Sequence, residues 1–127
     1  MYHLAARVGG IDFLHGNSKA ELEALQSNLA IDVNVFRACR EVGVKKIVYA
    51  SSVSVYPIDR QQKIGVIFKE EDIYPINPKG GYGWAKLVGE NQLRMMEECK
   101  AAVAARIFKY GEILEEKEDK CDGWLSE

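Results

Sequence analysis

The chain has 127 residues, of which 47% are hydrophobic and 28% charged, a balance typical of one globular domain. Its net charge of -2 gives no electrostatic reason to expect a nucleic acid or a membrane as a partner. No apolar run approaches the ~20 residues of a membrane span, and the N-terminus does not resemble a signal peptide. The three cysteines contain no CxxC pair, which argues against disulfides and a metal site and predicts a reducing, cytoplasmic location.

The first expected elements are a short strand and a long helix. Residues 2–6 are predicted to form a buried strand because they are mostly apolar. Ser18 and Glu21 have the spacing of a capping box, and the helix they begin is expected to run to about Glu41, with an interruption near Ser27 and Asn28. Its buried face is expected to carry apolar side chains three and four residues apart, namely Leu22, Leu25, Leu29, Val33 and Phe36.

The rest of the chain predicts a second strand over 44–50, a helix over 82–99, a third strand over 101–108 and a charged tail over 112–127. Between the second strand and its following helix lies a long segment without a helical stripe, and such a loop inside a compact domain is usually functional. Alternating strands and helices are typical of a parallel sheet covered by helices. The predicted fold class is therefore α/β.

Tyr82 and Lys86 carry the strongest chemical signal. Residues four apart share one helix face, so the phenol and the ammonium can serve one site. A nearby cation lowers the pKa of a tyrosine, which predicts that Tyr82 can take a proton from a hydroxyl group. Taken alone the pair is a weak signal, because a core tyrosine near a solvated lysine gives the same pattern.

Ser51 and Ser52 follow directly after the second predicted strand. Ligands of parallel sheets bind beyond the carboxyl ends of the strands, where a serine can donate a hydrogen bond to a reacting oxygen. Taken alone, two serines at this place are better explained as residues of a turn.

Six landmarks in a fixed order carry a resemblance that none of them carries alone. They are residues 3–6, Asn28, residues 49–57, Glu71 with Pro75, Asn77 and Pro78, residues 82–90, and Arg106 with Phe108. With these landmarks, the chain over residues 2–111 resembles the extended short-chain dehydrogenase/reductase family, also called the NAD-dependent epimerase/dehydratase family. Within it, residues 5–11 and 51–57 look most like its GDP-fucose synthase and GDP-mannose 3,5-epimerase branches.

The resemblance implies a Rossmann-like parallel sheet with flanking helices, and hydride exchange between NAD or NADP and a carbon of a nucleotide sugar. Ser52 matches the family's catalytic serine, Tyr82 its catalytic base, and Lys86 the lysine that binds the nicotinamide ribose. The other positions that the resemblance implies to be cofactor-binding are Leu4, Ala5, Ala6, Asn28 and Ser51.

The departures from the family pattern matter as much. The 127 residues contain no counterpart of the glycine-rich loop that holds the pyrophosphate at a helix N-terminus, so the fold is expected to lack its first βαβ half. The sugar-binding C-terminal part is also missing. Ser54 stands where the two similar branches carry an acid/base cysteine, and a hydroxyl is a weaker acid than a thiol.

We therefore expect residues 1–111 to form the central part of an NAD(P)-binding domain, and the chain alone to bind cofactor weakly or not at all. Two alternatives remain: a non-catalytic remnant or truncated reading frame that keeps the fold, and a chain that pairs with a separate N-terminal piece. A homodimer through the helices at 19–42 and 82–100 is expected by analogy with the family.

Overall fold

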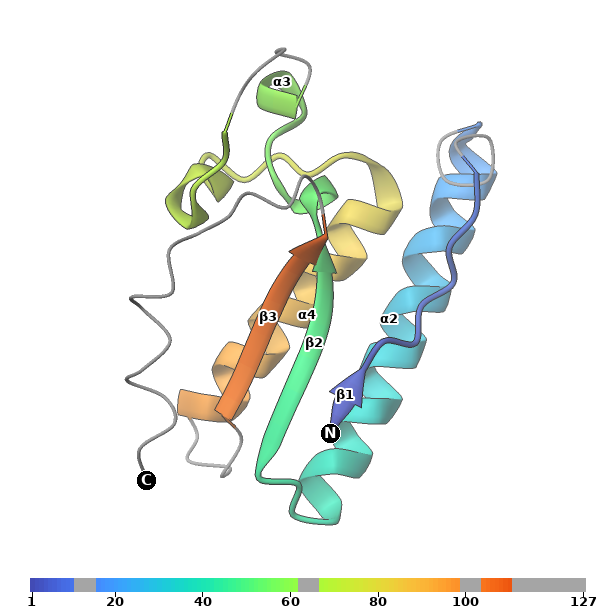
Figure 1. Cartoon of the computed structure of the whole chain (residues 1–127). Coiled ribbons are helices and arrows are strands. Elements are labelled where there is room, and N and C mark those ends of the chain that lie inside the picture. Colours follow the sequence, from blue (N-terminus) through green and yellow to red (C-terminus); the bar gives the residue numbers. More distant parts are fainter. Residues whose placement is uncertain (11–15, 62–66, 99–103, 111–127) are drawn as a thin grey trace.

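Three parallel strands form one sheet in the order β1-β2-β3 in the computed structural model, which describes residues 1–10, 16–61, 67–98 and 104–110 (Figure 1). The carboxyl ends of all three strands therefore lie at one edge of the sheet. The predicted charged tail at 112–127 lies outside the described residues. The elements are β1 (Tyr2–His3), α2 (Ser18–Glu41), β2 (Lys46–Ser52), the 3-10 turn η1 (Val53–Val55), α3 (Ile58–Gln61), the 3-10 turn η2 (Glu70–Ile73), α4 (Gly80–Glu98) and β3 (Ala104–Tyr110).

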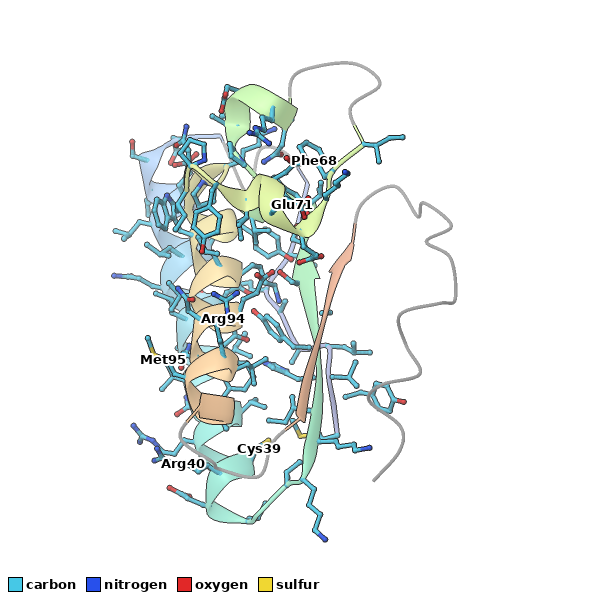
Figure 2. The ribbon with its side chains drawn as sticks, turned by 90° about the vertical axis from the view of Figure 1, so that its left-hand side faces the viewer. Cys39, Arg40, Phe68, Glu71, Arg94 and Met95 are labelled. Atoms are coloured by element: carbon cyan, nitrogen blue, oxygen red, sulfur yellow. The ribbon has the colours of Figure 1, made fainter. Side chains whose placement is uncertain are left out.

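The molecule has two layers, with α2 and α4 on the same face of the sheet (Figure 2). Because side chains alternate along a strand, Ile47 and Tyr49 of β2 point together toward this helical layer, where both are fully buried. They pack with Phe36 and Cys39 of α2 and with Leu93 of α4. None of the described elements covers the opposite face of the sheet (Figure 2).

Helix α2 differs from its prediction in two ways. The N-cap is Asn17, whose side chain accepts a hydrogen bond from the Ala20 amide, so the expected Ser18–Glu21 capping box is wrong. The helix also runs without the interruption expected near Asn28. Its buried face carries residues mostly four apart, including two polar ones: Ala24, Asn28, Asp32, Phe36 and Cys39.

The apolar stripe predicted for α2 is wrong at two of its positions, since Leu22 is 51% exposed and Val33 is 38% exposed. Polar residues can take the buried positions because each finds a hydrogen-bond partner there, which removes the cost of burying it. A search for apolar periodicity alone misses such a face.

The strands are also displaced from their predicted bounds. β1 covers only residues 2–3, and Tyr2 is 77% and Leu4 70% exposed, so the buried strand predicted over 2–6 is wrong in length and in burial. Among the described residues β1 pairs with β2 alone, and its outer edge has no neighbour. β2 begins two residues later than predicted, which places Ser51 and Ser52 inside the end of β2. β3 covers Ala104–Tyr110, and the first three residues of its predicted range, 101–103, lie outside the described residues.

The segment between β2 and α4 was predicted to be a long loop. It instead contains the short elements η1, α3 and η2, which fold over the carboxyl edge of the sheet. It has its own small core of Val55, Tyr56 and Ile73 against Leu87 of α4, and the Tyr56 ring stacks on Phe68 at 4.5 Å (Figure 2). Its two ends meet where Lys79 donates its amide hydrogen to the Ser54 carbonyl at 2.9 Å. The first turn of α4 is thereby held beside the end of β2.

Two glycines allow α4 to approach its neighbours closely. A Cβ atom at Gly81 would lie 2.0 Å from the Glu21 carbonyl oxygen of α2, and one at Gly83 would lie 2.3 Å from the Ser54 carbonyl oxygen of η1. Both contacts are with backbone, which cannot move aside as a flexible side chain can. Tyr82, between the two glycines, is therefore fixed against both α2 and η1.

Candidate functional site

A cavity of about 270 Å³ lies at the carboxyl edge of β1 and β2. Six of the eight residues predicted for the site line it, and the exceptions are Ala5 and Asn28. One wall is apolar and comes from the segment after β1, while the other carries hydroxyl and amine groups from β2 and α4. The lining residues are Leu4, Ala6, Val8, Ala50, Ser51, Ser52, Tyr82 and Lys86.

Lys86 is the most constrained side chain of this cavity. It is 2% exposed, and its ammonium donates a hydrogen bond of 2.9 Å to the Ala50 carbonyl oxygen. The same Nζ atom lies 4.5 Å from the centroid of the Tyr49 ring and 5.8 Å from that of Tyr82. An ammonium over an aromatic face is attracted by the ring quadrupole, so both tyrosines help to hold the charge.

Burial is the largest cause of the pKa shifts of Tyr82 and Lys86. It raises the pKa of the Tyr82 phenol above its usual value, and the Asp32 carboxylate adds to that rise. The pKa of Lys86 is lowered by burial, and the negative charge of Asp32 opposes the change. The expectation that the lysine lowers the pKa of Tyr82 is therefore wrong for this structure, and the phenol is protonated at neutral pH.

The two serines at the end of β2 have different partners. Ser51 is buried and donates its hydroxyl hydrogen to Oε1 of Glu90 on α4. The Ser52 hydroxyl oxygen accepts a hydrogen bond of 3.2 Å from the Ser54 amide. A hydroxyl group that accepts in this way keeps its own hydrogen for another acceptor. Ser54 itself, on η1, is not part of the cavity lining.

Asn28 holds one wall of the cavity in place through hydrogen bonds to the backbone of Arg7. It is 1% exposed, and its side chain accepts from the Arg7 amide and donates to the Arg7 carbonyl, each at 2.9 Å. It also donates to the Ala24 carbonyl within α2 at 2.8 Å. These bonds attach the wall formed by Ala6 and Val8 to the helix, although Asn28 does not line the cavity.

Sequence reasoning missed a buried polar cluster beneath the cavity. Asp32 Oδ1 lies 2.8 Å from His3 Nε2, and its Oδ2 accepts a hydrogen bond of 2.6 Å from the Tyr49 hydroxyl. Neither His3 nor Asp32 is among the residues predicted for the site. The available signal was the spacing of Asp32, one helical turn after Asn28 on the same face of α2.

The described residues contain no group of three or more His, Cys, Asp or Glu side chains able to hold a metal ion. Within the same residues, no helix is long and apolar enough to cross a membrane.

Comparison with known proteins gives matches to the chain as a whole. Residues 1–117 match the model of the NAD dependent epimerase/dehydratase family. GDP-mannose 3,5-epimerase 1 from Oryza sativa subsp. indica is 37% identical over 90 residues, which cover 71% of this chain and 23% of the relative. A putative GDP-L-fucose synthase 2 from Oryza sativa subsp. japonica is 44% identical over 59 residues, covering 46% of this chain and 16% of the relative.

A solved structure shows the same arrangement of strands and helices. The GDP-L-fucose synthetase from Naegleria fowleri bound to NADP has a TM-score of 0.67 at 25% identity, covering 85% of this chain and 32% of that protein. The predicted Rossmann-like parallel sheet is thus confirmed, as is the resemblance to the GDP-sugar branches of the family. This chain spans only about a quarter of the curated relatives that match most of it.

Proposed function

We propose, since the chain belongs to the NAD dependent epimerase/dehydratase family, that its cavity takes the nicotinamide end of NAD or NADP and serves hydride exchange at a carbon of a nucleotide sugar. The observation that carries the proposal is that Ser52, Tyr82 and Lys86 line one cavity at the carboxyl edge of a parallel sheet. This edge is where ligands of such sheets bind.

The chemistry of the cavity fits one end of a dinucleotide. Its volume of about 270 Å³ lies just below the ~300–1,000 Å³ usual for whole small-molecule sites, as suits one end of a larger ligand. Its apolar wall of Leu4, Ala6 and Val8 suits the face of a planar ring. Lys86 uses one of its three N–H donors on Ala50, which leaves donors for ribose hydroxyls. The bound nicotinamide would supply the hydride chemistry, and the protein supplies position and protons.

Tyr82 is proposed to transfer the proton. Because its raised pKa keeps the phenol protonated at neutral pH, the structure favours donation to the carbonyl oxygen of a keto-sugar while the carbon accepts hydride. The C=O bond becomes a C–OH group, and the phenolate left behind regains a proton from water. Ser52 would donate a hydrogen bond to the same oxygen. In the opposite direction the phenolate accepts the proton from the sugar hydroxyl.

The substrate class proposed first is a GDP-linked sugar, because the names of the two matched plant relatives contain GDP-mannose and GDP-fucose. The proposed compartment is the cytoplasm, in keeping with the free thiol of Cys39. Residues 1–111 are proposed to be the central part of the domain. A complementing N-terminal piece is the proposed partner, since the outer edge of β1 has no neighbour among the described residues. A homodimer through α2 and α4 is proposed as the second option.

Calorimetric titration with NAD and NADP tests the proposal. We expect the 127-residue chain to bind neither cofactor with micromolar affinity. Most of the binding energy for a dinucleotide comes from a glycine-rich loop and a helix N-terminus that bind its pyrophosphate. An extended chain that adds a strand, a glycine-rich loop and a helix before residue 1 is expected to bind in the micromolar range or better.

The matched control for this titration is the Lys19→Met variant of the extended chain, which removes an exposed lysine that does not line the cavity. Lys86→Met is expected to weaken binding and Lys19→Met to leave it unchanged. Extended protein that folds but binds neither cofactor would instead favour the non-catalytic remnant. Micromolar binding by the 127-residue chain alone would show that the cavity is more complete than proposed.

A further inference from the structure

Asp32 lies at the centre of a buried cluster that joins three elements. Its carboxylate, 1% exposed, is clamped between His3 of β1 at 2.8 Å and the Tyr49 hydroxyl of β2 at 2.6 Å. Three aromatic rings pack around it, with centroid distances of 5.4 Å for His3–Phe36 and 5.5 Å for both His3–Tyr49 and Phe36–Tyr49. Both carboxylate oxygens are therefore occupied, and the Tyr49 ring is fixed at its hydroxyl end.

The Lys86 ammonium lies over the face of the Tyr49 ring. Its Nζ atom lies 4.5 Å from the Tyr49 centroid and is bonded to the carbonyl of Ala50, the next residue of β2. Helix α4 packs against this cluster at Gly89. A Cβ atom at this position would lie 2.3 Å from the Tyr49 hydroxyl oxygen and 2.9 Å from Asp32 Oδ2. The sequence thus places a glycine of α4 directly over the Tyr49–Asp32 bond, three residues after the lysine.

We propose that Asp32 is a positioning residue for Lys86: its carboxylate fixes the Tyr49 ring under the ammonium and adds a buried negative charge on the far side of that ring. The inference rests on the proposed role of Lys86 in the cofactor site. Asp32 does not line the cavity, so it acts through Tyr49.

The surrounding charges agree with this assignment. Burial and the hydrogen bond to Asp32 raise the pKa of Tyr49, so its hydroxyl remains a donor. Around Lys86, the titratable groups of the described residues are Tyr49 on β2, Asp32 on α2 and Tyr82 on α4. His3 of β1 faces Asp32, and the charge of Glu90 on α4 acts on Tyr49. The charge of Asp32 opposes the loss of the Lys86 proton that burial favours.

The test is an NMR titration of Lys86 in the full 127-residue chain with ¹³C- and ¹⁵N-labelled lysine, its signals identified by their loss in Lys86→Met. Asp32→Asn keeps the size of the side chain and removes its charge. We expect this variant to lower the pKa of Lys86 by on the order of one unit. Tyr49→Phe keeps the ring and removes its tether, so we expect several-fold faster exchange of the Lys86 ammonium protons with water.

The matched control is Ile47→Val, on the same face of β2 two residues before Tyr49, which loosens the core beside Tyr49 without removing a polar group of the cluster. Because Ile47 packs beside Tyr49 but carries no polar group, this variant should change the Lys86 pKa and its exchange rate much less than Asp32→Asn and Tyr49→Phe do. The proposal is overturned if Asp32→Asn leaves the Lys86 pKa at the wild-type value or shifts it no further than Ile47→Val does. If Asp32→Asn does not fold, an unchanged ammonium exchange rate in Tyr49→Phe overturns it. No cofactor is present in these titrations, so their failure is distinct from a failure of cofactor binding.

Discussion

Replacing Tyr82 with phenylalanine in the extended, cofactor-binding protein is expected to slow hydride exchange with a nucleotide sugar by a factor on the order of 10²–10⁴. The substitution removes the proposed proton donor but keeps the ring beside Lys86. The affinity for NAD or NADP is expected to change little. Single-turnover measurement of nicotinamide absorbance with GDP-linked sugars gives the rate, and calorimetry gives the affinity.

The matched control is Tyr74→Phe, which removes a hydroxyl from a 57% exposed tyrosine outside the cavity. This variant should exchange hydride at the unaltered rate. A Tyr82→Phe rate that stays close to that of the control would remove Tyr82 from the mechanism. A rate lost together with all cofactor affinity would instead give the hydroxyl a binding role.

The second large effect is on stability. Asp32→Ala is expected to lower the free energy of unfolding by about 2–5 kcal/mol, because it leaves two buried polar groups, His3 and the Tyr49 hydroxyl, without their shared partner. Urea unfolding followed by circular dichroism measures the loss, and protein that is unfolded without urea meets the prediction as well.

Asp59→Ala serves as the matched control, since Asp59 is exposed at the start of α3. Removal of an exposed carboxylate is expected to change stability by no more than about 0.5 kcal/mol. If the two alanine variants unfold at the same urea concentration, the buried cluster contributes nothing to stability and its bonds cannot hold the Tyr49 ring in place.

Much of the site could be predicted because its residues lie at the end of a strand or one helical turn apart, and local sequence patterns indicate both positions. Ser52 and Tyr82 lie far apart in the chain, yet the carboxyl end of β2 and the first turn of α4 bring them to one cavity. The parallel order of the strands follows from their alternation with helices. The i to i+4 relation of Tyr82 and Lys86 needs only the helix.

What could not be predicted depends on contacts between distant residues. Burial, rather than the nearby ammonium, decides the pKa of Tyr82, and burial follows from packing that no local pattern shows. The same is true of Asp32, a charged residue on a face expected to be apolar, whose partners come from two strands. Ser51 lines the cavity as predicted for a cofactor-binding residue, but the bond of its hydroxyl to Glu90, 39 residues further along, depends on a distant contact that no local pattern shows.

The central claim is that the nicotinamide ring binds in the cavity against Tyr82, and nuclear Overhauser contacts measure this directly. In the extended protein saturated with NAD or NADP, we expect contacts between the nicotinamide ring protons and the Tyr82 ring protons, with further contacts to the methyl groups of Leu4 and Ala6. All of them should disappear when unlabelled nicotinamide cofactor is replaced by one deuterated on the ring. Contacts found only with the exposed Trp84 or Leu22, which line a groove on the outer side of α2 and α4, would contradict the account.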